Sequence, residues 1–364
     1  MKCFAQRLRP FFSRGDFLQS TDLLYNLVNI PSISTHEHDI SLFIEEILHD
    51  LGMEIIRSGN NLIGKLGREG PVLALCGHLD TVPPFFPPRI QGRKLYGRGA
   101  ADDKGGLAAI INAVANTDQA RLRGTLLTAF VVDEELRSRG AQDVLPQLRA
   151  DFGIICEPTN LKIVNGQKGR LTFRIQSVGK RAHASKPELG KNAIVEMAKL
   201  VLRLEEIPLI RHPELGNETI TVSTIAAGDA VNIVPDLCSV DVDYRYVPPD
   251  DASSVLATLR AKLPEARIEF ADDPKNFTRP FYLPAHQIIT LLRESIRRTS
   301  LEPQMVTMDA GTDASRFNEA GIPTVVFGPG GIAQAHTSDE WIELREVEMA
   351  SVVFQELIRR VLMT

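Results

Sequence analysis

Three apolar segments that lie far apart in the chain are each followed by side chains that can bind a metal ion. The segments are residues 72–76, 126–132 and 152–156, and the side chains that follow them are those of His78 and Asp80, of Glu134 and Glu135, and of Glu157. Short segments of this composition are typical of buried strands, and open α/β sheets gather ligands beyond the carboxyl ends of their strands. One imidazole and several carboxylates at one edge concentrate negative charge, which cations must neutralise. The sequence therefore predicts a metal site.

A fourth segment, residues 97–107, is rich in small residues and carries Asp102. Residues 107–111 continue as a helix, so Asp102 lies just before a helix N-terminus, where free N–H groups and the helix dipole favour a carboxylate. A phosphate-binding loop is the alternative, but the segment lacks the Gly-Lys-Ser/Thr ending and the glycine spacing of a dinucleotide-binding turn. A fifth segment, residues 328–340, follows an apolar stretch and carries His336.

Composition excludes several classes of protein. The 364-residue chain carries 46 acidic and 41 basic residues, and it has no basic cluster flanked by aromatic residues, which argues against a nucleic-acid partner. No segment approaches 18 consecutive apolar residues, so no membrane-spanning helix is expected. The cysteines are Cys3, Cys76, Cys156 and Cys238, and they show no paired spacing. Such cysteine usage suits a reducing compartment, and we expect a cytoplasmic protein of one or two domains.

Helical and strand patterns alternate in the first 170 residues, which predicts an α/β layer architecture. Helices are expected over residues 22–28, 40–51 and 107–116, with a capping box from Ser34 to Glu37 ahead of the second. After Gly169 the expected order is strand, helix, strand, strand, helix and strand. These elements cover residues 170–178, 192–204, 218–226, 236–247, 251–262 and 267–271, and residues 272–284 would lead back. That order is typical of a ferredoxin-like unit.

The N-terminal residues 1–14 place Lys2, Arg7, Arg9 and Arg14 among apolar side chains. They lack the uninterrupted apolar segment and the cleavage pattern of a signal peptide. We expect an amphipathic helix or arm, and the role of residues 1–20 stays open.

Five motifs in chain order resemble the signatures of the co-catalytic zinc aminoacylase/carboxypeptidase family, which is peptidase family M20. They are Gly77-His78-Leu79-Asp80-Thr81-Val82-Pro83, Gly97-Arg98-Gly99-Ala100-Ala101-Asp102-Asp103-Lys104-Gly105, Asp133-Glu134-Glu135, Cys156-Glu157-Pro158 and Ala335-His336. The resemblance extends from about residue 20 to the C-terminus. The family includes acetylornithine deacetylases and succinyl-diaminopimelate desuccinylases, and the closing motif around His336 is most similar to the former.

The resemblance implies two Zn²⁺ ions per subunit, which Co²⁺ could replace. It assigns His78 and Glu157 to one ion and Glu135 and His336 to the other, with Asp102 bridging. Imidazole and carboxylate groups are suitable zinc ligands, and one shared carboxylate serves two ions about 4 Å apart.

Two further acidic residues have roles by the same resemblance. The resemblance implies that Glu134 is the general base and that Glu135 is the ligand. Adjacent side chains diverge in an extended segment, so one of the two can bind the metal while the other reaches the metal-bound water. Asp80 lies two residues beyond His78 and could accept the other ring N–H, which would fix the tautomer. A simple turn or cap residue is the alternative for Asp80.

The resemblance also implies substrate-binding residues in the second half of the chain. His183 would reach the substrate carbonyl oxygen across a dimer interface, although its spacing alone suggests a surface loop histidine. Asn232 and Arg245 match positions that contact substrate, and Arg245 suits bidentate binding of a carboxylate. An ordinary solvated sheet residue is the alternative for Arg245. The Gly-led segment 311–317 adds the candidates Thr312, Asp313 and Arg316.

Together these observations predict an α/β fold. A mixed-sheet catalytic domain would comprise residues 1–168 and 282–364, because His336 must join ligands from the first half. Residues 169–281 would form an inserted ferredoxin-like lid and dimerisation domain. The expected activity is removal of a small N-acyl group from an amino acid, above all N-acetylornithine to ornithine and acetate, as in arginine biosynthesis. The alternatives are a succinyl-diaminopimelate desuccinylase, another N-acyl-amino-acid deacylase, or a carboxypeptidase or dipeptidase. The acyl group and the amino acid stay open.

Overall fold

The chain divides into two compact units in a computed structural model that describes residues 20–270 and 277–363. Unit 1 comprises Met1–Val164, Ala285–Met305 and Glu319–Thr364, and unit 2 comprises Asn165–Pro284 and Val306–Asn318. Unit 2 is longer than the predicted inserted segment 169–281, because it extends from Asn165 to Pro284 and also takes in residues 306–318. The helix or arm expected over residues 1–14, Cys3 and part of the predicted connection 272–284 lie outside the described residues.

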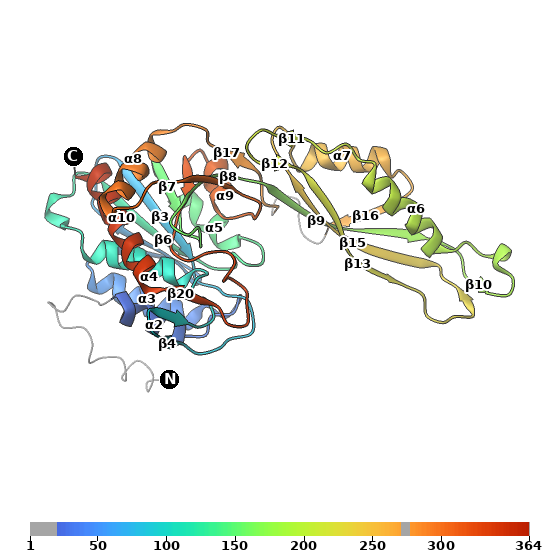
Figure 1. The fold of residues 1–364 in the computed structure, drawn as a ribbon, viewed down its shortest axis with the longest axis horizontal. Helices are drawn as coiled ribbons and strands as arrows, with labels where there is room; N and C mark the ends of the chain where they lie inside the picture. The colour runs from blue at the N-terminus through green and yellow to red at the C-terminus, as the bar shows by residue number, and fades with distance from the viewer. Residues whose placement is uncertain (1–19, 271–276, 364) are drawn as a thin grey trace. The chain divides into compact units, whose positions relative to one another are not determined.

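Unit 1 is built on a mixed sheet in the order β1-β2-β6-β3-β7-β19-β8, of which Figure 1 labels β6, β3, β7 and β8. The strands are β1 (Glu54–Ser58), β2 (Asn61–Leu66), β3 (Val72–His78), β6 (Thr125–Val131), β7 (Phe152–Ile155), β8 (Ile163–Gln167) and β19 (Thr324–Val326). β3 runs parallel to β6 and β7, and β7 runs parallel to β19. All seven residues of β6 are buried, as expected for a parallel strand covered on both faces. The carboxyl ends of the strands that precede the predicted ligands therefore meet at one edge.

Helices pack against this sheet. They are α2 (Ser20–Asn29), α3 (His38–Asp50), α4 (Lys104–Ala115), α5 (Arg139–Val144), α8 (Gln287–Ile296) and α10 (Leu344–Leu362), with short 3-10 turns η1 (Gln119–Arg121), η2 (Leu145–Gln147) and η5 (Arg297–Thr299). α10 packs against α2, α4 and α8, as Figure 1 also shows, and it reaches β3 and β6. α3 packs against β1 and β2, and α5 against β2 and β6. No helix of the described residues is long and apolar enough to cross a membrane.

A small three-stranded sheet in unit 1 has the order β20-β5-β4. It joins β4 (Arg89–Gln91) and β5 (Lys94–Tyr96) to the late strand β20 (Trp341–Glu343). Trp341 is opposite Tyr96 in the register, and the ammonium group of Lys94 lies 3.2 Å from the centroid of the Trp341 ring. This sheet fixes the chain on either side of it, including the segment that follows His336.

Unit 2 contains an antiparallel sheet in the order β13-β15-β9-β16. Its strands are β9 (Gly169–Val178), β13 (Thr219–Ala227), β15 (Leu237–Tyr246) and β16 (Arg267–Phe270), and its helices are α6 (Ala193–Glu205) and α7 (Ala252–Lys262). Burial alternates along β9 and β15, so one face of the sheet is packed, as expected for an antiparallel sheet. The six elements predicted after Gly169 are all present in the predicted order, with ends within a few residues.

Shorter elements complete unit 2. They are β10 (Ala182–His183), β11 (Arg211–His212), β12 (Gly216–Asn217), β14 (Ile233–Val234), β17 (Phe281–Tyr282), β18 (Met305–Met308), η3 (Pro187–Leu189) and α9 (Ala314–Glu319). β10 pairs with β14, β11 pairs with β12, and β17 pairs with the end of β8.

The predicted capping box from Ser34 to Glu37 is wrong. α3 begins at His38, and its N-cap Glu37 makes no side-chain cap hydrogen bond. The hydroxyl of Ser34 instead donates to Oδ2 of Asp80 at 2.7 Å. Hydrogen bonds to an ionised acceptor are stronger than neutral ones, so the buried carboxylate outcompetes the helix terminus.

Candidate metal centre

His78 is the last residue of β3, at the carboxyl end of the parallel strands. Its Nε2 lies 3.0 Å from Oδ1 of Asp102, and its Nδ1 lies 2.9 Å from the backbone carbonyl oxygen of Asp80. Burial alone would lower the pKa of His78, but hydrogen bonds to Asp102 and Asp80 raise that pKa well above its ordinary value. The imidazole is thus held between acceptors on both of its ring nitrogens.

Asp102 lies between two imidazoles. Its Oδ1 contacts His78, and its Oδ2 lies 3.3 Å from Nε2 of His336. Burial would raise the pKa of Asp102, but its contacts with His336 and His78 hold that pKa well below the ordinary value. One carboxylate that reaches two ligand-type side chains has the arrangement that a bridging ligand of two metal ions requires.

Glu134 and Glu135 follow β6 in a turn, so the extended geometry expected for them is wrong. The turn begins at Asp133, whose φ is 61°. The two side chains nevertheless have different partners. Oε1 of Glu135 lies 2.9 Å from Nε2 of His336, whereas Glu134 groups with His78 and Glu157.

Glu157 and His336 complete the cluster from two other parts of unit 1. Glu157 follows β7 and is 6% exposed, and burial together with the charges of Glu134 and Asp102 raises its pKa well above the ordinary value. His336 has a φ of 61° and a half-exposed side chain. Hydrogen bonds to Asp102 and Glu135 raise the pKa of His336 to about 10.

Two sets of ligand atoms each lie within 4.8 Å of one another. The first set is His78, Asp102 and Glu135, and the second is His78, Glu134 and Glu157. Oε1 of Glu157 is a buried oxygen without a hydrogen-bond partner among the described residues. Several carboxylates and two imidazoles at one edge, with one buried oxygen unsatisfied, fit divalent metal ions that take N and O ligands.

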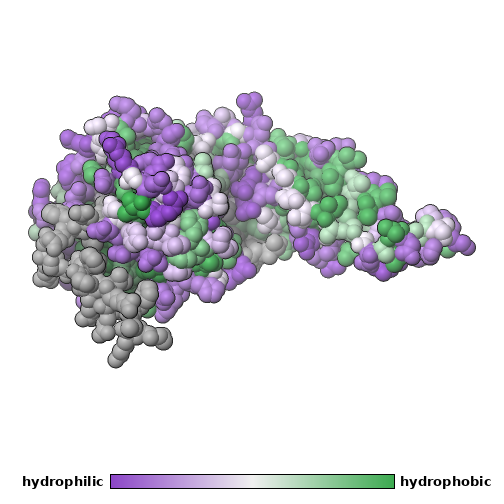
Figure 2. Space-filling model, turned by 60° about the horizontal axis from the view of Figure 1, so that its bottom comes forward, coloured by the Kyte–Doolittle hydropathy of each residue, from purple (hydrophilic) through white to green (hydrophobic). Residues whose placement is uncertain are grey.

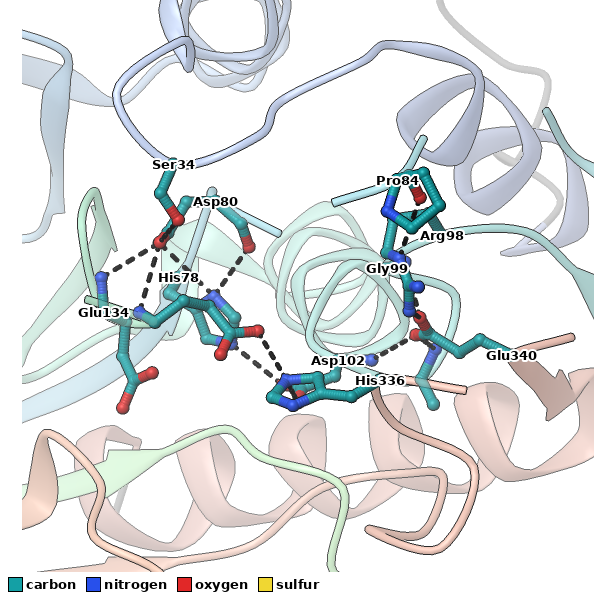
Figure 3. Close-up of polar contacts among 12 residues, drawn as sticks. Ser34, His78, Asp80, Pro84, Arg98, Gly99, Asp102, Glu134, His336 and Glu340 are labelled. Atoms are coloured by element: carbon teal, nitrogen blue, oxygen red, sulfur yellow. Dashed lines mark hydrogen bonds and ion pairs between the residues drawn. The ribbon is translucent and has the colours of Figure 1, made fainter. Parts of the chain in front are cut away.

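Asp80 orients this cluster through the backbone (Figure 3). Its Oδ1 accepts the N–H of Glu134 at 3.0 Å, and its Oδ2 accepts the N–H of Glu135 at 3.2 Å together with the hydroxyl of Ser34. Its carboxylate is 3.5 Å from Nδ1 of His78, and its backbone oxygen is the closer acceptor of that ring. Asp80 therefore fixes the turn that carries Glu134 and Glu135 as well as the ring of His78.

Sequence reasoning missed Ser34 and Lys104. Lys104 is the first residue of α4 and is 1% exposed, and its Nζ donates to the carbonyl of Ile30 at 2.7 Å. Burial lowers the pKa of Lys104 to about 7. A lysine amid glycines and apolar residues is the signal that could have identified it, whereas Ser34 gave a misleading capping signal.

Six of the predicted substrate-binding and catalytic residues lie in unit 2, beginning with His183 and Asn232. His183 is exposed in β10, and its Nδ1 lies 2.8 Å from the hydroxyl of Ser185. It is opposite Ile233 of β14, and the N–H of Ala184 donates to the carbonyl of Asn232 at 2.9 Å. His183 and Asn232 are therefore neighbours on one small ladder.

Arg245 of β15 already has anionic and carbonyl partners. Its Nε donates to Oδ1 of Asp243 at 2.7 Å, and its Nη1 donates to the carbonyl of Asp309 at 3.2 Å. Its neighbour Arg170 shares the carboxylate of Asp243. A substrate carboxylate at Arg245 would have to share or displace Asp243.

Thr312, Asp313 and Arg316 lie at the start of α9 or just before it, and all three are buried. The hydroxyl of Thr312 donates to Oε1 of Gln167 at 2.7 Å, and the N–H of Arg316 donates to the carbonyl of Asp313 at 2.9 Å. The predicted Gly-led loop at 311 is thus a packed connection into a short helix.

A hydrolytic metal centre on a mixed α/β sheet is the class of site that these residues define. The sequence profile of Peptidase family M20/M25/M40 matches residues 74–360, and the chain belongs to this metal-dependent family of hydrolases. The resemblance drawn from the five motifs is confirmed.

Relatives of similar length are known. The chain is 30% identical to an acetylornithine deacetylase of Proteus mirabilis over 378 residues, which cover 93% of this chain and 95% of that protein. It is 32% identical over 367 residues to a Mycobacterium tuberculosis protein named provisionally as a succinyl-diaminopimelate desuccinylase, with 96% and 98% of the two chains covered.

Solved structures share the fold. The aminopeptidase PepT of Bacillus cereus matches with a TM-score of 0.81 and 22% identity, over 95% of this chain and 99% of that one. A Bacillus subtilis peptidase described as dinuclear metal-binding matches with a TM-score of 0.69 and 19% identity, over 94% and 97% of the two chains. The α/β fold with a mixed sheet is therefore confirmed.

The raised pKa of His336 predicts a pH effect on the metal-free protein. An imidazole whose pKa rises from about 6.5 when unfolded to about 10 when folded adds stability that is fully present below pH 6.5. That stability is lost as the pH rises toward 10. The melting temperature of chelator-treated protein should therefore fall between pH 6.5 and 9.5, and His336→Gln should reduce the fall. His183→Gln is the control and should show the same fall in melting temperature as the wild type. If His336→Gln also shows the same fall, the pH effect does not come from His336.

Proposed function

We propose that this M20 hydrolase is a dizinc amidohydrolase that removes a small N-acyl group from an amino acid, with N-acetylornithine as the preferred substrate. The products would be ornithine and acetate. The observation that carries the proposal is the position of Asp102 between His78 and His336, with Glu135 on one side and Glu157 within the same cluster. We assign His78 and Glu157 to one zinc ion, Glu135 and His336 to the other, and Asp102 to both. Co²⁺ could replace zinc.

Glu134 is proposed as the residue that moves protons. Bound zinc would act as a Lewis acid and would lower the pKa of water. Glu134 lies in the group with His78 and Glu157, and Asp80 holds its backbone. It would accept the proton of the attacking water and then deliver that proton to the leaving amine. Asp80 would keep both the turn and the His78 ring in place.

The substrate proposal rests on the relatives. The acetylornithine deacetylase and the desuccinylase-named protein are each matched at about 30% identity over nearly the full chain. At this level, similarity supports the deacylase class and leaves the acyl group open. The second candidate is a succinyl-diaminopimelate desuccinylase, and a carboxypeptidase or dipeptidase is the third. The described cysteines, Cys76, Cys156 and Cys238, are buried and form no disulfide among the described residues, which supports a cytoplasmic location.

We further propose that unit 2 acts as the lid and as the dimerisation domain, with His183, Asn232 and Arg245 contacting substrate. α6 carries the exposed apolar residues Ile194, Val195 and Leu202. Figure 2 shows hydrophobic surface gathered on unit 2. β13 is an edge strand of nine residues, and unpaired strand edges can pair with another chain. A homodimer would cover both features.

A substrate panel tests the reaction class. Purified enzyme loaded with Zn²⁺ or Co²⁺ should hydrolyse N-acetylornithine with a kcat/KM at least about tenfold above that for N-succinyl and dipeptide substrates, which is about 1.4 kcal/mol of transition-state binding. Masking the substrate carboxylate as a methyl ester should lower kcat/KM about a hundredfold if Arg245 binds it. A tenfold preference for the succinyl substrate or for a dipeptide would replace the proposal by the second or third candidate.

Glu134→Gln tests the proton-transfer role. The variant should keep two metal ions by elemental analysis and lose at least about a hundredfold in kcat, because general acid–base catalysis contributes about that much or more. Glu135→Gln is the control, and it should lower the metal content instead. Near-normal kcat in Glu134→Gln with two ions bound would rule out this base.

Charged substitutions on α6 test the dimer. Analytical ultracentrifugation should find the wild type as a dimer, and Val195→Asp combined with Leu202→Asp should yield a monomer. Those side chains are 50% and 62% exposed, so a folded monomer would tolerate the change. Leu42→Asp on α3, 42% exposed, is the matched control and should leave the dimer intact. A fully active monomeric wild type would exclude both the dimer and the role of His183 across it.

A further inference from the structure

Glu340 is a buried carboxylate that the proposed reaction does not use. It lies four residues after His336, and its relative exposure is 0%. Its Oε2 accepts hydrogen bonds from Nη1 of Arg98 at 2.8 Å and from the N–H of Gly99 at 3.0 Å. Its Oε1 accepts the N–H groups of Ala101 at 2.9 Å and Asp102 at 3.1 Å. Every one of these donors belongs to residues 97–102, as Figure 3 shows for those that it labels.

The strand register explains why Glu340 meets this segment. β20 pairs with β5 in antiparallel register, with Trp341 opposite Tyr96. Glu340, which precedes Trp341, therefore lies opposite Gly97, which follows Tyr96. The N–H of Gly97 donates to the backbone carbonyl of Glu340 at 3.0 Å. The turn after β5 then folds around the carboxylate. Gly99, whose φ is 82°, supplies one of the N–H groups in a conformation that side chains rarely adopt.

The charge of Glu340 is specifically accommodated. Burying a carboxylate is costly unless it is paired and hydrogen-bonded. The carboxylate of Glu340 accepts hydrogen bonds from one guanidinium and from three backbone N–H groups. Arg98 is itself 2% exposed, and its Nε donates to the carbonyl of Pro84 at 3.2 Å. Removing the carboxylate would leave these donors buried without their acceptor.

Two proposed metal ligands depend on this arrangement. Asp102 donates its backbone N–H to Glu340, while its carboxylate reaches both His78 and His336. His336 lies four residues before Glu340, and β20, which pairs with β5, begins at the residue after Glu340. A single side chain therefore ties the segment that carries Asp102 to the segment that carries His336.

We propose that Glu340 is a positioning residue that keeps Asp102 and His336 in register, so that the ion shared by Asp102, Glu135 and His336 binds tightly only when the Glu340 carboxylate is in place. This inference rests on the ligand assignment of the proposed function. Residues that orient metal ligands typically change metal affinity about 10–100-fold when they are replaced.

Glu340→Gln tests the inference, because an amide places a donor against N–H donors where a carboxylate oxygen accepted them. Apo protein is titrated with Co²⁺ and followed by its d–d absorption and by the fluorescence of Trp341, the one tryptophan of the chain. The wild type should bind two ions. The variant should bind the second ion at least about tenfold more weakly than the wild type does, and the fluorescence of Trp341 should change less on binding.

Glu218→Gln is the matched control. Glu218 is 1% exposed in unit 2 and accepts the hydroxyl of Tyr244 and the N–H groups of Ile210 and Val247. It should lose stability as Glu340→Gln does and still bind both ions with wild-type affinity. If Glu340→Gln does not fold, Glu340→Asp decides, since it keeps the charge but is one methylene shorter and should weaken the second ion as well.

The outcomes separate the two levels of the argument. Two ions bound at wild-type affinity in Glu340→Gln, or in Glu340→Asp if only that variant folds, would overturn the positioning role and leave the dizinc proposal intact. An equal loss of the second ion in Glu218→Gln would also overturn it, because the effect would then be general destabilisation. A wild type that binds only one ion would refute the dizinc proposal itself and this inference with it.

Discussion

The carboxylate of Asp102, held between the imidazoles of His78 and His336, is the contact on which the organisation of unit 1 depends. This contact requires the end of β3, the start of α4 and the loop that carries His336 to meet at one point. α4 can approach β3 this closely because Gly77 has no side chain. A Cβ there would lie 2.5 Å from Oδ2 of Asp103 and 2.7 Å from Cδ2 of Leu107. A side chain at position 77 would therefore push α4 away from β3 and move Asp102 away from His78.

Most of the fold followed from patterns that are local in sequence. A strand that is buried on both faces, such as β6, is a continuous apolar segment. In β9 and β15, which are buried on one face, buried and more exposed residues alternate. The sequence of each strand therefore indicates how many of its faces are covered. The positions of His78, Glu135 and Glu157 at strand ends were equally predictable, because parallel strands bring their carboxyl ends to one edge. The domain limits were harder. Residues 306–318 group with unit 2 through contacts that leave no local signal in the chain.

Side chains that support the proposed ligands were the least predictable part. Ser34 carries the signature of a helix cap, yet its hydroxyl serves the carboxylate of Asp80. Glu340 looks like one more acidic residue near the C-terminus, and its partners lie about 240 residues earlier in the chain. Such roles depend on long-range register, here that of β20 with β5, and a single sequence does not encode a pairing in any recognisable pattern. Glu134 and Glu135 have different partners, and they lie in a turn and not in the extended segment that was expected.

The distribution of the ligands along the chain has a consequence for biosynthesis. Glu135 and His336 are 201 residues apart, and α10, which follows His336, packs on the helix that begins just after Asp102. During translation the carboxylates of the first half emerge long before the last imidazole and before the helix that covers them. A nascent chain that does not yet contain residue 336 therefore carries these carboxylates without one imidazole of the proposed ligand set. Contacts of such long sequence separation are slow to form. Metal binding at the proposed site would therefore depend on a late step of folding, which brings the segment around His336 to these carboxylates.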